Sequence, residues 1–154
     1  MVDFLWNREK ANQCKSGLDE LVYRSNLLGA DRRVCNWGGG NTSMKTTITD
    51  FRGREIEVMW VKGSGSDLAA AKSGNFTGLR MEDIRPLMER DAMSDEEMVA
   101  YLSHCMIDAR HPRASIETLL HAFLPFAHVD HTHPDAIVSI CCADNGREMA
   151  REIF

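Results

Sequence analysis

Two histidines with metal-ligand spacing lie in the segment HVDHTHP, residues 128–134. In a strand, side chains two residues apart leave the same face, so His131 and His133 could share one ion. His128 has the opposite parity, and we expect it to point away. Imidazoles suit zinc and similar divalent ions, and catalytic zinc sites commonly have three protein ligands and an open position. An isolated H-x-H pair can also be two solvent-facing polar side chains of a strand that bind no metal, so the pair alone leaves both interpretations open.

Upstream of the histidines lie one carboxylate and two glycine-rich loops that could complete a site. Glu117 opens a predicted helix, where a carboxylate is stabilised by the helix N-terminus and can also be a simple cap. The loops are GGGNTS, residues 38–43, and GSGS, residues 63–66. Glycines let backbone N–H groups approach an anion closely, although a tight turn explains either loop taken alone. Neither loop has the spacing of a Walker A or dinucleotide-binding motif.

The predicted elements place these residues around one sheet. Apolar periodicity indicates a helix over residues 9–28 with Gly29 as its stop, and alternation indicates strands over 42–49 and 55–62. Further predicted segments are a helix over 81–90, a helix from the Ser94 capping box to about 107, a helix over 116–124, an extended stretch over 127–133 and a helix from 147. Strands flanked by helices predict an α/β sandwich with a central, mainly antiparallel sheet.

Composition limits the classes of protein and partner. The chain has 154 residues, of which 44% are hydrophobic and 27% charged, as expected of one globular domain over 1–154. A net charge of -5 argues against nucleic acid and against an anionic membrane surface as partners. No stretch approaches the roughly 20 apolar residues of a membrane span. The five cysteines include no C-x-x-C pair, which favours reduced thiols and a cytoplasmic location.

Four short motifs, in this order, resemble the class II aldolase/adducin family. They are GNTS at 40–43, KGSG at 62–65, SIE at 115–117 and HTHP at 131–134. The longer stretches around the first two resemble most closely the aldolase domain of bifunctional rhamnulose-1-phosphate aldolase/lactaldehyde dehydrogenase proteins. No trace of the dehydrogenase domain is found in these 154 residues.

The resemblance implies a site and a reaction. Glu117 falls at the family's acid/base carboxylate, and His131 and His133 fall on two of its three zinc ligands. The third ligand would lie beyond Phe154, so we expect a chain cut short before the site is complete. The implied reaction is cleavage of rhamnulose 1-phosphate to dihydroxyacetone phosphate and lactaldehyde, through an enediolate that Zn²⁺ or another divalent ion stabilises. The positions where the family binds the substrate phosphate are Asn41, Ser43, Ser64, Gly65 and Ser115.

The sequence is compatible with other functions of the same family. The same fold and metal serve sugar-phosphate epimerases and dehydratases, and fold alone does not separate these from aldolases. An adducin-like interaction domain or an inactive fragment is a further alternative, which tightly bound metal would argue against. Relatives of this kind form homo-oligomers with sites at subunit boundaries, and we expect the same of the intact domain.

Overall fold

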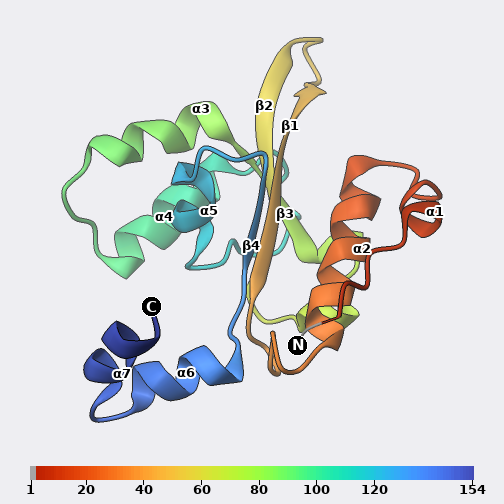
Figure 1. Cartoon of the computed structure of the whole chain (residues 1–154). Helices are drawn as coiled ribbons and strands as arrows, with labels where there is room; N and C mark the ends of the chain where they lie inside the picture. Colours follow the sequence, from red (N-terminus) through yellow and green to blue (C-terminus); the bar gives the residue numbers. More distant parts are fainter. Residues whose placement is uncertain (1–2) are drawn as a thin grey trace.

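The structure is a computed structural model that describes residues 3–154. Four strands form one antiparallel sheet in the order β3-β2-β1-β4 (Figure 1). The predicted mixed α/β architecture with a mainly antiparallel sheet is therefore confirmed. The helices and strands are α1 (Arg8–Ala11), α2 (Gly17–Ala30), β1 (Asn41–Thr49), β2 (Glu55–Lys62), β3 (Phe76–Arg80), α3 (Met81–Ile84), α4 (Asp95–Cys105), α5 (Thr118–Phe123), β4 (His128–His131), α6 (Asp135–Cys142) and α7 (Gly146–Ile153), with short 3-10 turns at Leu68–Ala70, Ser73–Asn75 and Arg85–Glu89.

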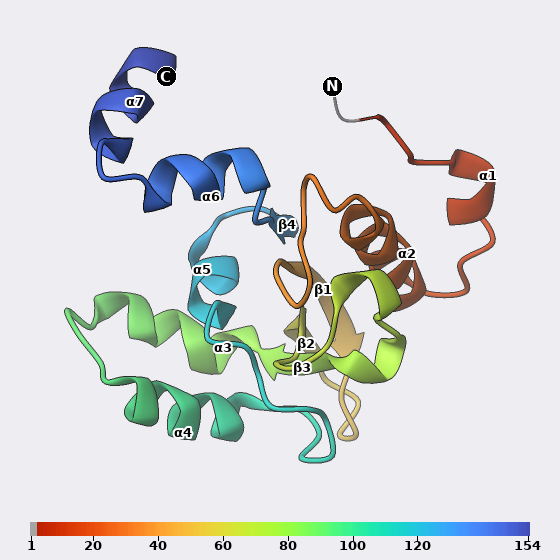
Figure 2. The same cartoon turned by 90° about the horizontal axis from the view of Figure 1, so that it is seen from below.

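Helices cover both faces of the sheet. Helix α2 lies against one face, and α3, α4 and α5 lie against the other, as the two perpendicular views show (Figures 1 and 2). Each face has its own apolar cluster. Leu21, Met44 and Phe76 are buried on the α2 side, whereas Met59 and Leu79 are buried with residues of α3 to α5 on the other side.

The register of β1 decides which of its side chains reach which face. Asn41 lies opposite His131 of β4, and Ser43 lies opposite Val129. Directly opposed residues of antiparallel strands share a face, so Asn41, Ser43 and His131 all point toward the α5 side. Thr42 points the other way, where its Oγ1 lies 2.6 Å from Ser25 Oγ of α2. The alternation of β1 thus separates a polar site face from the face that packs on α2.

Two predicted helices are wrong in their boundaries. The helix expected over 9–28 is divided into α1 and α2, because Ser16 begins α2 by accepting a hydrogen bond from Asp19 N. Gly29 lies inside α2 rather than ending it, and a Cβ there would lie 2.2 Å from Ala69 N. The glycine is needed for close packing. The helix expected over 81–90 becomes 3-10 after Ile84, where Pro86 lacks the backbone N–H that an α-helix uses.

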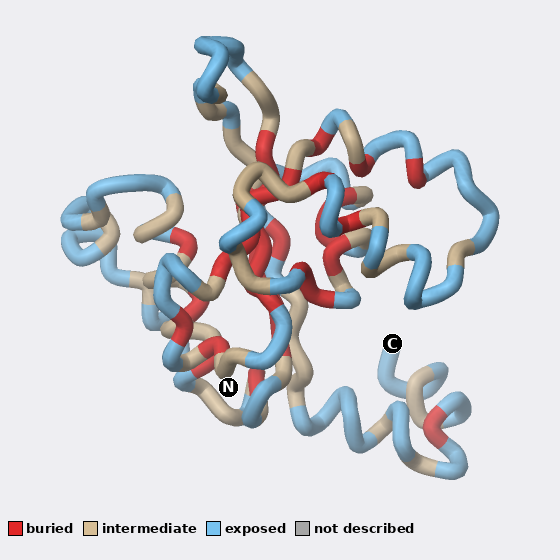
Figure 3. Tube along the Cα trace, turned by 180° about the vertical axis from the view of Figure 1, so that it is seen from behind, coloured by how far each residue is buried: buried red, intermediate tan, exposed pale blue. Residues whose placement is uncertain are grey.

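The last two helices form a separate arm. α6 and α7 pack mainly on each other and extend away from the sheet, and most of their residues are exposed (Figures 1 and 3). Asp135 ties the start of α6 to the loop after α2, since Asn36 Nδ2 donates to its Oδ1 at 3.2 Å and its N–H donates to Arg33 O at 3.3 Å. Within the described part of the chain, no helix combines the length and apolarity needed to cross a bilayer.

Candidate metal centre

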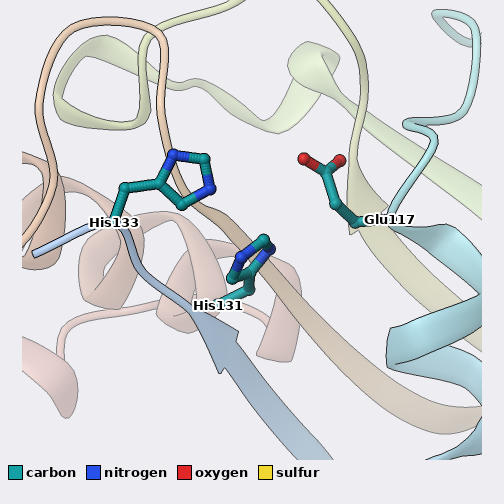
Figure 4. Close-up of side chains that lie close together, drawn as sticks. All are labelled: Glu117, His131 and His133. Carbon is teal, nitrogen blue, oxygen red and sulfur yellow. The ribbon is translucent and has the colours of Figure 1, made fainter. Parts of the chain in front are cut away.

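Glu117, His131 and His133 converge at one end of the sheet. One ligand atom from each side chain lies within 4.8 Å of the other two, and all three residues are half-buried. The side chains project from different elements into the same space (Figure 4). The imidazole centroids of His131 and His133 are 4.7 Å apart, with the rings inclined at 62°. This group has the composition and spacing of a metal-binding cluster.

The histidines are held by the sheet and by the glycine loop before it. His131 ends β4, which is fixed to β1 through the Asn41–His131 register. His133 forms a parallel bridge with Cys35. A Cβ at Gly39 would lie 2.9 Å from Nδ1 of His133, so only glycine lets the loop pass this ring so closely. Pro134 then begins α6 and ends the extended stretch.

Glu117 is placed by the turn that starts α5. It is the N-cap residue, with φ -78° and ψ 0°, and its N–H donates to Ser115 Oγ at 3.3 Å. Asn41 Nδ2 donates to Lys62 O at 3.1 Å and makes a longer 3.5 Å contact with Glu117 Oε2. One amide of β1 therefore links the carboxylate to the end of β2.

Several buried polar atoms around the cluster are left without a protein partner. Nδ1 of His131 and Oδ1 of Asn41 are buried and have no hydrogen-bond partner among residues 3–154. Burying an unpaired polar atom costs about 1–3 kcal/mol, so native sites usually satisfy such atoms with protein, water or an ion. Two imidazoles and one carboxylate are ligand types that zinc accepts. The residues present therefore fit a divalent cation.

The loop at 63–66 lies beside the start of α5, because Gly63 forms an antiparallel bridge with Ala114. The N–H groups of Gly63 and Ser64 already donate to Asn75 O and Arg113 O, at 2.8 and 3.0 Å. Donors that remain in this loop include the Ser64 hydroxyl, the backbone of Gly65, whose φ is +86°, and the buried Ser66 hydroxyl, which has no hydrogen-bond partner among the described residues. Ser115 is buried and accepts from the Glu117 N–H.

Lys62 and His121 are buried at the site, and sequence reasoning assigned a role to neither of them. The Lys62 ammonium donates to Ser66 O at 2.8 Å and to Gly63 O at 3.2 Å. Burial lowers its pKa, and the negative charge of Glu117 opposes that shift. His121 lies one helical turn after Glu117, and its Nδ1 is 2.8 Å from Ser43 Oγ. The spacing of Glu117 and His121, four residues apart in a predicted helix, was the available signal.

His128 lies outside the cluster, as its strand parity predicts. Its Nδ1 is 2.7 Å from Nη1 of Arg24, on the α2 side of the sheet. The same guanidinium forms an ion pair with Asp130 at 3.0 Å and donates to Ser43 O at 2.8 Å. Burial raises the pKa of Asp130, with the positive charge of Arg24 acting against that effect. These contacts fix β4 to α2 from behind the site.

Comparison with known proteins gives three similarities. The family model for the class II aldolase and adducin N-terminal domain matches residues 19–153. A Bacillus subtilis (strain 168) protein named "Uncharacterized oxidoreductase YuxG" is 73% identical over all 154 residues, and the chain spans only 22% of that protein's length. The solved N-terminal class II aldolase domain of a conserved protein from Thermoplasma acidophilum superposes with a TM-score of 0.85 at 45% identity, over 94% of this chain and 66% of that one.

Proposed function

Because the chain belongs to the class II aldolase and adducin N-terminal domain family, we propose that its cluster binds a divalent metal ion and serves the aldol cleavage of a ketose 1-phosphate. The observation that carries this proposal is the convergence of Glu117, His131 and His133 within 4.8 Å. Zinc is the ion we propose, since imidazole nitrogens make up most of the available donor set.

His131 and His133 would hold the ion, and the Glu117 carboxylate lies within reach of it. A bound divalent ion supplies a Lewis acid that stabilises negative charge developing on substrate oxygens. The chain's own contribution is to orient the ligands. The sheet fixes His131, the Cys35 bridge and Gly39 fix His133, and the turn at Ser115 fixes Glu117. Such fixed geometry is what keeps a coordination site open and specific.

Glu117 is proposed as the group that moves a proton. In aldol cleavage the hydroxyl next to the breaking bond loses its proton, the C–C bond breaks to release an aldehyde, and the carbon left behind takes up a proton. A carboxylate can perform the transfer when it reaches the proton within hydrogen-bond distance. Glu117 is half-buried at the cluster, and among residues 3–154 its carboxylate has one long side-chain hydrogen-bond contact, with Asn41, so its oxygens are available for this role.

We further propose that the phosphate binds between the glycine loops and the start of α5. The buried ammonium of Lys62 gives this region a positive charge, and its hydrogen bonds to Gly63 O and Ser66 O fix the loop. The Ser43 hydroxyl lies 2.8 Å from His121 Nδ1, so it can donate to a phosphate when the ring nitrogen is the donor of that pair. The proposed substrate is rhamnulose 1-phosphate, with dihydroxyacetone phosphate and lactaldehyde as products. The proposed phosphate contacts are Asn41, Ser43, Ser64, Gly65 and Ser115.

The test is the metal content of the purified chain, measured by elemental analysis. We expect near-stoichiometric zinc in the wild type and a loss on the order of 100-fold in affinity for His131→Ala, because even residues behind a ligand cost 10–100-fold. Glu117→Gln keeps the side-chain shape and one oxygen donor, so it should keep its metal with an affinity lowered on the order of 10-fold, while losing turnover of the ketose phosphate. His111→Ala is the matched control, since it removes a half-buried imidazole outside the cluster.

The outcomes separate the candidate functions. Metal retained with no cleavage of any ketose 1-phosphate would favour an epimerase or dehydratase of the same family. A wild-type chain that binds no zinc, cobalt or manganese would overturn the proposal and favour a non-catalytic, adducin-like role.

A further inference from the structure

A buried histidine connects the helix that carries Glu117 to the strand that carries Asn41. His121 and Ser43 are both fully buried, and His121 Nδ1 lies 2.8 Å from Ser43 Oγ. The other ring nitrogen, Nε2, is buried with no hydrogen-bond partner in the described chain. Burial lowers the pKa of His121 to about 4, so the ring is neutral at pH 7. A neutral imidazole here can pair with a hydroxyl without burying a charge.

Helix α5 and strand β1 meet through two contacts with matching spacing. Glu117 and His121 are four residues apart, which corresponds to about 6 Å along a helix. Asn41 and Ser43 are two residues apart, which corresponds to about 6.8 Å along a strand. The Glu117–Asn41 contact at 3.5 Å and the His121–Ser43 contact at 2.8 Å can therefore form together in one register of α5 on β1. Of the two contacts, the one between His121 and Ser43 is shorter and more deeply buried.

α5 needs such an anchor because it is short. It spans Thr118–Phe123, six residues, and helices of this length are not stable in isolation. Its exposed side includes Leu120, which is 48% accessible, so apolar packing holds the helix mainly from one side. Sliding of α5 along β1 would carry Glu117 away from His131 and His133.

We propose that His121 is a positioning residue that, through Ser43, sets the register of α5 on β1 and so holds the Glu117 carboxylate within ligand distance of His131 and His133. The consequence for metal affinity rests on the proposed function, whereas the consequence for the Glu117–Asn41 contact does not. In this assignment the main role of the Ser43 hydroxyl is to pair with His121 and so to fix α5 on β1.

The first experiment measures the pairing itself in metal-free protein. A double-mutant cycle of Ser43→Ala and His121→Leu, followed by urea unfolding in EDTA, should show that the two changes are coupled by a factor of about 5 or more in the unfolding equilibrium constant. His121→Asn retains a polar atom near the position of Nδ1. In that variant Ser43→Ala should destabilise the protein nearly as much as it does in the wild type. Additivity of the two substitutions would overturn the proposed pairing.

The second experiment follows the position of Glu117 with and without metal. The side-chain amide signals of Asn41, assigned with Asn41→Ser, should shift in metal-free His121→Leu because the Glu117–Asn41 contact is displaced. Cobalt or zinc affinity should fall on the order of 10-fold in His121→Leu and recover in His121→Asn. His111→Leu is the control, since it deletes a half-buried imidazole whose Nδ1 accepts from Gly78 N at 3.2 Å.

Equal effects of His121→Leu and His111→Leu on the Asn41 signals would show that His121 only contributes to stability, and would overturn the inference. If the wild type binds no metal, the proposed function fails, and the Asn41 signals still decide whether His121 positions Glu117. Unchanged metal affinity in His121→Leu, with metal bound by the wild type, would also overturn it.

Discussion

Replacing Gly40 by alanine should destabilise the protein for two separable reasons. Gly40 has φ +80°, and a Cβ added there would lie 2.1 Å from Cys35 Sγ and 3.2 Å from His131 O. An L-residue in the left-handed region costs about 1–2 kcal/mol. Forcing extra volume into a packed interior costs about 1–3 kcal/mol more. Gly40→Ala should therefore lower the free energy of unfolding by about 2–5 kcal/mol.

Gly53 supplies the matched control. It has φ +77° in the turn between β1 and β2, but a Cβ there would meet nothing within 4 Å. Gly53→Ala should carry the backbone cost alone, about 1–2 kcal/mol. Urea unfolding of both variants in EDTA measures the difference. In a Cys35→Ala background the extra cost of Gly40→Ala should shrink. Equal destabilisation by the two glycine substitutions, or an undiminished cost without Cys35, would refute the reasoning.

Two further outcomes are expected. Ser94→Ala removes the hydroxyl that accepts from Glu97 N at 3.2 Å in the capping box of α4, and should cost about 1 kcal/mol in the free energy of unfolding measured by urea; a change below about 0.3 kcal/mol would contradict the role of the cap. The pKa of His121, lowered to about 4 from the ordinary 6.5 chiefly by burial, predicts stability that is fully present above pH 6.5 and is lost as pH falls toward 4. The loss is at most about 3 kcal/mol and should be smaller in His121→Asn, which pH-dependent unfolding in EDTA would show.

The parts of the site that could be predicted are those that depend on local spacing. The H-x-H pair shares a face because strands alternate, and Glu117 lies at a helix start because the apolar periodicity begins after it. These local rules located His131, His133 and Glu117, the family resemblance joined them into one candidate site, and the structure brings the three side chains together. Their roles stay predictions until metal is measured.

The contacts that sequence reasoning missed depend on distant partners. His121 meets Ser43, which is 78 positions away in the chain, and no periodicity reports that pairing. Strand β3 was also missed, because Gly78 interrupts its pattern of strand formers. Its lack of a side chain is what the fold uses, since a Cβ there would lie 2.6 Å from Ile107 Cδ1. Tertiary packing thus overrode the local preference at this position.

The arm formed by α6 and α7 makes the stability of the protein uneven along the chain. Because the two helices pack mainly on each other, we expect them to open as one cooperative unit while the sheet stays folded. His133 lies at the boundary between that unit and the sheet, next to the Asn36–Asp135 hydrogen bond that ties the arm down. A cation held jointly by His131 and His133 would therefore connect the arm to the sheet and oppose its opening. By thermodynamic linkage, whatever keeps the arm docked also strengthens the hold on the ion.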